Sequence, residues 1–273
     1  MPQPRRKDRG DRTPLEIERP RLLLALAARA QLPVRIVCAP AGAGKTTLLR
    51  HYVTRIPGAR YLAARPGLSA SSLHAALAQP GHGVVVLDDF DRVEPLVAAA
   101  LIRAVTSGRL THRRLIIAGR ARRLLHVRRL LAGGLAALLD TRDLAFDPDE
   151  ARRLADKLRL RFEDGELAQL LDLTDGWTLA LSWILRTAAA DRTTLRVALE
   201  RWSSRQGAAL LEYVEENAFD DIDVRRTFIT ALSETSHGRK TAWESVEAGG
   251  GPVIWAEGEL RPYRILATLA GRS

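Results

Sequence analysis

Cysteine and long apolar runs are scarce in this sequence, and each scarcity excludes some classes of protein. Cys38 is the single cysteine among 273 residues, so no disulfide can form within the chain, and we expect a reducing, cytoplasmic setting. The six histidines lack the paired spacing of metal ligands, which argues against a zinc site. No apolar run reaches the roughly 18 residues that a membrane span requires, so we expect no membrane partner.

Aromatic residues are also few, at 5% of the chain, and the excess charge is positive. The sequence holds 42 Lys and Arg residues against 32 Asp and Glu, a formal charge of +10, which favours an acidic or polyanionic partner. The basic residues are scattered, and no stretch interleaves them with the aromatic side chains that stack on single-stranded nucleic acid. We therefore do not expect direct DNA binding by this chain.

A glycine-rich loop follows the first strongly apolar run. Residues 39–47 read Ala-Pro-Ala-Gly-Ala-Gly-Lys-Thr-Thr, directly after the apolar residues 34–38. This order predicts a strand and a phosphate-binding loop, whose backbone N–H groups surround the β-phosphate while the lysine neutralises the β- and γ-phosphates. The candidate nucleotide-binding residues of the loop are Ala39, Pro40, Ala41, Gly42, Ala43, Gly44, Lys45, Thr46 and Thr47, with Ala39 in place of the usual first glycine.

Two carboxylates end the next buried strand. Residues 84–87 are all apolar and precede Asp88 and Asp89, as in a parallel strand that is covered on both faces. We expect Thr46 and Asp88 to hold Mg²⁺, and we expect Lys45 and Asp89 to be catalytic, with Asp89 orienting or deprotonating the attacking water. The alternative is that residues 88–91 form a solvated turn that caps the next helix.

A third apolar run, residues 115–119, ends at Arg120. Because parallel sheets bind ligands at the carboxyl ends of their strands, Arg120 would lie on the nucleotide side and sense the γ-phosphate. The alternative is an ordinary surface arginine, since the chain is rich in arginine.

The alternation of strands and helices predicts an α/β fold, a three-layer P-loop NTPase with a parallel sheet. The predicted strands are 34–38, 60–64, 84–89, 115–120 and one within 138–146, and the predicted helices are 15–30, 47–53, 69–79, 94–106 and 122–131. We assign residues 14–146 to this nucleotide-binding domain and residues 1–13 to a disordered basic tail.

Helices without intervening strands follow Phe146. Asp147-Pro148-Asp149-Glu150 is a helix start, and helices are predicted over 148–160, 164–173, 176–189, 193–218 and 222–233. A β-hairpin about Glu257-Gly258 and a last helix complete the chain. We expect a helical domain at 147–206 and a winged-helix-like domain at 207–273.

Several of these segments together resemble the signal-transduction ATPases of the STAND class, in particular the MalT-type large regulators of the LuxR group. The matching elements are Arg19-Pro-Arg21-Leu, the loop 39–47, Leu87-Asp-Asp-Phe90, Ala118-Gly-Arg120, Leu144-Ala-Phe146 with Glu150, and Thr174-Asp-Gly-Trp177. The family usually has a proline where this chain has Thr178. It also continues into sensor repeats and a DNA-binding helix-turn-helix, which this sequence does not contain.

The resemblance implies a switch between ATP and ADP that depends on Mg²⁺, with the ADP form closed and the ATP form able to self-associate. It places Arg19 and Arg21 near the base, Trp177 at the start of the helix next to the adenine, and Arg120 at the phosphates. A protein partner or the transcription machinery would receive the signal. The residues themselves leave simpler interpretations open, in which Arg19 and Arg21 only begin a helix and Trp177 is only a core aromatic.

The leading functional hypothesis is therefore a regulatory ATP/ADP switch with slow hydrolysis. The alternative is an AAA-like or helicase-loader-like ATPase, which couples fast turnover to remodelling of protein or DNA. A third hypothesis is an interaction module that keeps the nucleotide only as a structural ligand.

Overall fold

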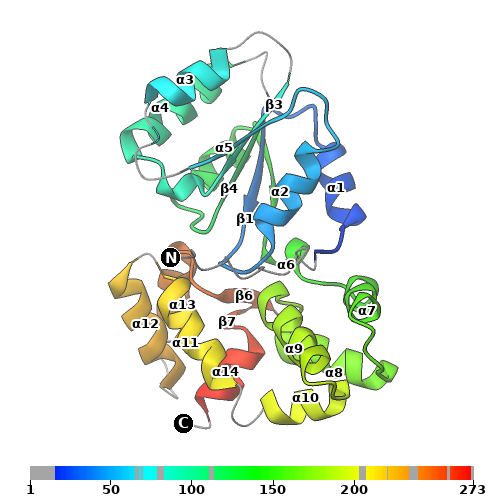
Figure 1. Ribbon diagram of the computed structural model, residues 1–273. Helices are drawn as coiled ribbons and strands as arrows, with labels where there is room; N and C mark the ends of the chain where they lie inside the picture. Colours follow the sequence, from blue (N-terminus) through cyan, green and yellow to red (C-terminus); the bar gives the residue numbers. More distant parts are fainter. Residues whose placement is uncertain are drawn as a thin grey trace, which may run out of the picture.

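The computed structural model describes residues 16–64, 68, 70–78, 83–110, 114–202, 207–219, 221–233, 239–256 and 259–271. A five-stranded sheet in the order β2-β3-β4-β1-β5 forms the upper part of the molecule in Figure 1. All neighbouring strands are parallel, as the alternating pattern predicted. The strands are β1 (Val34–Cys38), β2 (Arg60–Ala63), β3 (Val84–Asp88), β4 (Arg114–Gly119) and β5 (Ala136–Leu139). The predicted tail at residues 1–13 lies outside the described residues.

Helices cover both faces of the sheet and make the three predicted layers (Figure 1). One face packs against α1 (Pro20–Ala27) and α2 (Lys45–Val53). The other face packs against α3 (Ala70–Ala78), α4 (Pro95–Thr106) and α5 (Val127–Ala132). The alternation of β3 explains this arrangement, because Val84 and Val86 face one layer while Val85 and Leu87 face the other.

The prediction of a strand within 138–146 is only partly right. β5 ends at Leu139, and residues Thr141–Leu144 form the short helix α6. The Asp140 carboxylate accepts a hydrogen bond from the Arg142 amide, and the Asp143 carboxylate accepts one from the Asp140 amide. This reciprocal capping stabilises a helical turn where the apolar residues alone suggested a strand.

Three helices follow, as expected from the sequence: α7 (Pro148–Lys157), α8 (Asp164–Thr174) and α9 (Thr178–Ala190). Helix α7 begins at the predicted helix start, where Asp147 and Glu150 form a capping box and the Asp147 carboxylate accepts from the Glu150 amide at 2.7 Å. The segment predicted as one helix over 193–218 is described as α10 (Leu195–Arg201) and α11 (Gly207–Asn217), and residues 203–206 between them lie outside the described residues. Gly207 allows close packing at the second helix, since a Cβ there would lie 1.9 Å from Leu269 Cδ2.

The last part of the chain holds α12 (Ile222–Ser233), α13 (Arg239–Ala248), the antiparallel strands β6 (Val253–Ala256) and β7 (Glu259–Pro262), and α14 (Arg264–Ala270). We name residues 207–271 the C-terminal module. The strands confirm the predicted hairpin, although its turn at 257–258 lies outside the described residues. Helix α13 was not predicted from the sequence; it buries Trp243 and Val246 three residues apart on one face.

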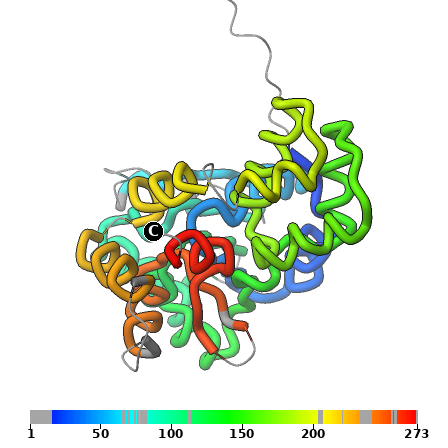
Figure 2. The backbone as a smooth tube through the Cα atoms, turned by 90° about the horizontal axis from the view of Figure 1, so that it is seen from below, coloured from blue at the N-terminus to red at the C-terminus, as the bar shows by residue number. Residues whose placement is uncertain are grey.

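The helices α7–α10 and the C-terminal module lie together beyond the carboxyl ends of the strands (Figure 1). Seen from below in Figure 2, the two groups stand side by side, with α14 in red next to both. One hydrophobic core, including Trp177, Trp202 and Leu266, runs through both groups. No described helix has the length and apolar character needed to cross a membrane.

Candidate functional site

The loop between β1 and α2 has the backbone that a phosphate-binding loop requires. Gly42 and Gly44 have φ angles of +74° and +81°, a left-handed conformation that glycine adopts without a steric penalty. Gly42 has a second constraint, because a Cβ there would lie 2.5 Å from Leu179 Cβ on α9. Gly44 is the N-cap of α2, so the N-terminus of this helix, which attracts anions, faces the loop.

Lys45 is buried and is held by the loop itself. Its ammonium donates hydrogen bonds to the carbonyl oxygens of Ala39 at 2.6 Å and Pro40 at 2.9 Å. Burial and, secondarily, the charge of Arg120 lower the pKa of Lys45, while the carboxylates of Asp91 and Asp88 raise it, and the net pKa is about 8. A phosphate in the loop would supply the counter-charge that this buried ammonium needs.

Thr46 and Asp88 meet directly, as expected for a pair that shares a metal ion. The Thr46 hydroxyl donates to Asp88 Oδ2 at 2.7 Å, and the Tyr61 hydroxyl donates to the same oxygen at 2.6 Å. A hydroxyl and a carboxylate are the hard oxygen ligands that Mg²⁺ prefers together with phosphate oxygens. No group of three or more His, Cys, Asp or Glu residues that could hold a metal occurs among the described residues.

Sequence reasoning missed Tyr61, although it is the third partner at this position. Tyr61 lies on β2 beside β3, in register with Val86. Burial and the hydrogen bond to Asp88 raise the pKa of its hydroxyl to about 12, so Tyr61 remains a donor at neutral pH. Only the pairing of β2 with β3 brings it to Asp88, and no local motif encodes that pairing.

The two acids after Asp88 differ in their surroundings. Asp89 has a φ of +53° and caps the 3₁₀ turn η1 (Phe90–Arg92), and its amide donates to Asp88 Oδ1 at 3.0 Å. Asp89 is half-buried, and no hydrogen bond of its carboxylate is seen within the described part of the chain. The carboxyl group of Asp91 is packed inside against β4. The solvated turn considered for residues 88–91 is therefore wrong for Asp88 and Asp91.

Arg120 follows β4 at the carboxyl edge of the sheet, where the sequence placed it, and contacts the C-terminal module. Its guanidinium donates to the carbonyl oxygen of Asn217 at 3.3 Å. Gly250 packs against the same residue, since a Cβ there would lie 2.6 Å from Arg120 Cβ. Arg120 thus contacts the C-terminal module and is also near enough to Lys45 for its charge to lower the pKa of that ammonium.

Arg19 and Arg21 hold the start of α1 against the junction of α6 and α7. Arg19 is buried and donates to Glu150 Oε2 at 2.6 and 3.0 Å and to the carbonyl oxygens of Leu144 and Ala145. Its guanidinium lies 4.7 Å from the centre of the Phe146 ring. Arg21 is exposed and reaches Asp147 and Glu150, each at 3.1 Å. These contacts favour the helix-start interpretation for both arginines.

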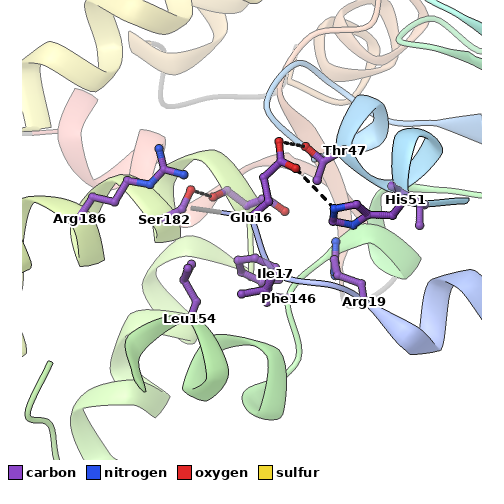
Figure 3. Close-up of a pocket in the computed structure, with 12 residues that line it drawn as sticks. Glu16, Ile17, Arg19, Thr47, His51, Phe146, Leu154, Ser182 and Arg186 are labelled. Atoms are coloured by element: carbon purple, nitrogen blue, oxygen red, sulfur yellow. Dashed lines mark hydrogen bonds and ion pairs between the residues drawn. The ribbon is translucent and has the colours of Figure 1, made fainter. Parts of the chain in front are cut away.

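A cavity of about 90 Å³ opens beside the phosphate-binding loop (Figure 3). Its wall combines apolar and polar side chains from the N-terminal segment, α2, α7 and α9; the lining residues are Glu16, Ile17, Arg19, Gly44, Thr47, Leu48, His51, Phe146, Leu154, Thr178, Ser182 and Arg186. Glu16 points toward Thr47 and His51 and lies 3.4 Å from His51 Nε2. Of the predicted site residues, Arg19, Gly44 and Thr47 reach this wall, whereas Glu16, His51, Ser182 and Arg186 carry no motif that could reveal them.

The first turn of α9 lies on the phosphate-binding loop. Trp177 Nε1 donates to the Ala41 carbonyl oxygen at 3.1 Å, and the Thr178 hydroxyl donates to that of Ala43 at 3.4 Å. The Trp177 ring is buried and stacks on Tyr263 of the C-terminal module, with the ring centres 4.6 Å apart and the planes 6° from parallel. Trp177 is therefore both a core aromatic and a neighbour of the loop.

Asp175 fixes the same turn to the C-terminal module. Its carboxylate accepts from the Arg261 guanidinium at 2.7 and 2.9 Å and from the Arg264 amide at 2.7 Å. Arg264 also pairs with Asp172 on α8. The three residues 175–177 therefore contact both the phosphate-binding loop and the segment 261–264.

Comparison with known proteins shows similarity in fold only. No protein-family profile and no curated protein sequence matches the chain. The Walker-type ATPase Paby2304 of Pyrococcus abyssi has a similar structure, with a TM-score of 0.61 and 12% identity over 100% of this chain and 99% of that chain. The Holliday-junction branch-migration motor RuvB of Thermotoga maritima has a TM-score of 0.51 and 15% identity over 88% of this chain and 89% of its own. The chain has the α/β fold of P-loop ATPases.

Proposed function

We propose that the protein is an adenine-nucleotide switch that binds ATP and ADP with Mg²⁺ and hydrolyses ATP slowly. The observation that carries this proposal is the double contact of residues 175–177, which touch the phosphate-binding loop on one side and the C-terminal module on the other. A ligand in the loop would change those contacts, and a ligand shifts an equilibrium only through such differences between states.

The proposed nucleotide site uses the residues that the fold gathers at the carboxyl ends of β1 and β3. The amides of the loop 39–47 and the ammonium of Lys45 would hold the phosphates, and Thr46 and Asp88 would hold Mg²⁺. The metal would supply charge neutralisation for the transferred phosphoryl group. Asp89 is our candidate for orienting the attacking water, and Arg120 for sensing the γ-phosphate.

The base would occupy the cavity beside Thr47, whose apolar wall includes Phe146 and Leu154. Arg19 lines this cavity and would lie beside the base. Arg21 forms ion pairs with Asp147 and Glu150 and does not line the cavity. To bind phosphate, the Lys45 ammonium would have to leave the carbonyls of Ala39 and Pro40. The same movement would disturb Ala41 and Ala43, to which Trp177 and Thr178 donate.

We further propose that the switch is of the STAND class and similar to the core of MalT-type regulators, with a role in transcriptional regulation. The support is the sequence resemblance, together with the contact between the Thr174-Asp-Gly-Trp177 segment and the loop. The proposed division is a nucleotide-binding domain at 14–146, a helical domain at 147–206 and a winged-helix-like domain at 207–273. The ATP state would self-associate or recruit a protein partner, which light scattering with ADP and then with an ATP analogue would test.

The second candidate is an AAA-like ATPase that remodels protein or DNA. The fold similarity to RuvB, over 88% of this chain, is the observation that favours it. This function predicts fast hydrolysis that a polymer stimulates, whereas the switch predicts slow hydrolysis that added DNA does not change. A phosphate-release assay with and without duplex and single-stranded DNA separates the two.

Lys45→Ala should abolish the stabilisation of the fold by nucleotide. The variant removes the one buried ammonium of the loop, and a charge-assisted contact to phosphate contributes on the order of 1.5–3 kcal/mol. Thermal unfolding of wild type and variant with ATP, ADP and GTP, each with Mg²⁺, measures this. Equal shifts in the unfolding temperature of the two proteins would show that Lys45 and its loop do not bind the nucleotide.

Asp89→Asn should bind ATP and Mg²⁺ normally but turn ATP over about 100-fold more slowly, since the amide cannot accept the proton of water. Binding is measured by calorimetry with a non-hydrolysable analogue, and turnover by phosphate release. Unchanged turnover would exclude Asp89 from the chemistry without affecting the proposal of nucleotide binding.

A further inference from the structure

Asp91 was not among the residues that the sequence suggested for the site, yet its carboxyl group is built into the carboxyl edge of the sheet. It lies in η1, directly after β3, and its Oδ1 is buried without a hydrogen-bond partner among the described residues. Gly119, the last residue of β4, makes room for it: a Cβ on Gly119 would lie 2.6 Å from Asp91 Oδ1 and 2.9 Å from Leu125 Cδ2. Any larger residue at position 119 would displace the carboxyl group.

The charges around Asp91 belong to the proposed phosphate site. Burial raises the pKa of Asp91, while its own backbone amide, the charges of Lys45 and Arg120, and the backbone amide of Arg120 lower it. Asp91 is also the largest charge that favours the protonated form of Lys45, ahead of Asp88. A carboxyl group that packs against the end of β4 and lies near enough to both cations to interact with their charges suits a role in placing them.

We propose that Asp91 is a positioning residue, whose carboxyl group, seated against Gly119, holds the end of β4 so that Arg120 can sense the terminal phosphate. This inference rests on the proposed nucleotide site. Arg120 has an alternative partner in the carbonyl oxygen of Asn217 at 3.3 Å on the C-terminal module. Asp91 would therefore determine whether Arg120 binds the C-terminal module or the γ-phosphate. ATP has a γ-phosphate and ADP lacks it.

The experiment measures the binding of Mg–ADP and of a non-hydrolysable Mg–ATP analogue by calorimetry. The dissociation constant for ADP divided by that for the analogue gives the preference for the ATP analogue, and this quotient is the ratio compared between variants. The variants are Asp91→Asn, Arg120→Ala and the double variant. Gly119→Ala keeps the Asp91 charge but displaces the carboxyl group. Gly165→Ala, which meets nothing within 4 Å, and Asp223→Asn, at an exposed helix residue, are the matched controls.

We expect Asp91→Asn, Gly119→Ala and Arg120→Ala each to lower the preference for the ATP analogue about tenfold, as the loss of one charge-assisted contact does. The double variant should lower it no further than Arg120→Ala, because Asp91 acts through Arg120. ADP affinity should stay within about threefold of wild type in all of them, which a general loss of structure would not allow, and both controls should keep the wild-type ratio.

An unchanged ratio in Asp91→Asn, or multiplied losses in the double variant, would overturn the inference while the nucleotide site stands. A lowered ratio in Asp91→Asn with none in Arg120→Ala would also overturn it. If Asp91→Asn does not fold, as judged by circular dichroism, Gly119→Ala decides the question by the same criterion. Failure of the wild-type chain to bind either nucleotide would instead refute the proposed function, and this inference with it.

Discussion

At the scale of single residues, Arg19 and Arg21 show how burial changes the contribution of similar ion pairs to stability. Both donate to Glu150 Oε2, which is itself buried, but the side chain of Arg19 is 7% exposed and that of Arg21 is 41% exposed. An exposed ion pair contributes little because water screens it. Loss of one partner from a buried pair leaves an uncompensated charge in the core.

Arg19→Met should therefore destabilise the fold by about 3 kcal/mol, since Arg21 alone would remain to compensate Glu150. Arg21→Met, the matched control, should cost about 1 kcal/mol or less. Urea unfolding followed by circular dichroism measures both free energies. If the two variants lose equal stability, the burial of the Arg19–Glu150 pair does not determine its contribution.

At the scale of secondary-structure elements, the first turn of α9 connects the sheet to the helices below it. Its side chains Trp177 and Thr178 satisfy carbonyl oxygens of the phosphate-binding loop, and Leu179 packs over Gly42. An element that satisfies the polar groups of a loop also restricts the conformations of that loop. The position of α9 and the conformation of the loop are therefore coupled.

Trp177→Phe tests this coupling, because phenylalanine keeps the stack on Tyr263 but cannot donate to Ala41. We expect a loss of about 1 kcal/mol in the free energy of unfolding and a nucleotide-induced thermal shift that differs from wild type. The control is Trp183→Phe, whose ring makes edge contacts with Trp202 and Tyr213 and does not lie on the loop. An identical nucleotide response in Trp177→Phe and wild type would show that α9 has no part in the proposed switch.

At the scale of the whole molecule, polar contacts at several positions attach the C-terminal module to the rest, in addition to the shared core. Asp175 binds Arg261 and Arg264, Arg122 pairs with Glu247 at 2.8 Å, and Arg120 reaches Asn217. All of these contacts lie beyond the carboxyl ends of the strands, next to the phosphate-binding loop. A change in the loop can therefore reach the module through contacts that already exist.

Asp175→Ala should loosen the module, because Arg261 loses its carboxylate and the Arg264 amide loses its acceptor. We expect a stability loss of about 2–3 kcal/mol and faster hydrogen exchange at 253–262, with the exchange of β1 and β3 unchanged. Asp191→Ala, which breaks an exposed pair with Arg201, is the control and should change neither. Uniformly faster exchange across the sheet would show that Asp175 supports the whole fold rather than this junction.

Much of the fold follows from local sequence pattern. The strands at 34–38 and 84–88 and the helices from Lys45 and Pro148 begin and end near the predicted residues, because apolar runs, glycines and capping acids act over a few neighbours. Predictions from local pattern failed where long-range packing or side-chain capping determines the secondary structure. Reciprocal capping by Asp140 and Asp143 ends β5 early, and α13 is fixed by Trp243 and Val246 in a core shared with distant helices.

The site divides in the same way. Sequence alone determined the phosphate-binding loop and the carboxylate strand, because glycine at positive φ, a lysine and a strand-ending aspartate are chemical needs of neighbouring residues. Only the tertiary structure determined that Tyr61 binds Asp88, that the Asp91 carboxyl group packs against Gly119, and that Trp177 contacts the loop. The first of these contacts joins residues 27 positions apart and the last joins residues 136 positions apart. Such pairs are set by strand order and helix packing, which no local stretch of the chain encodes.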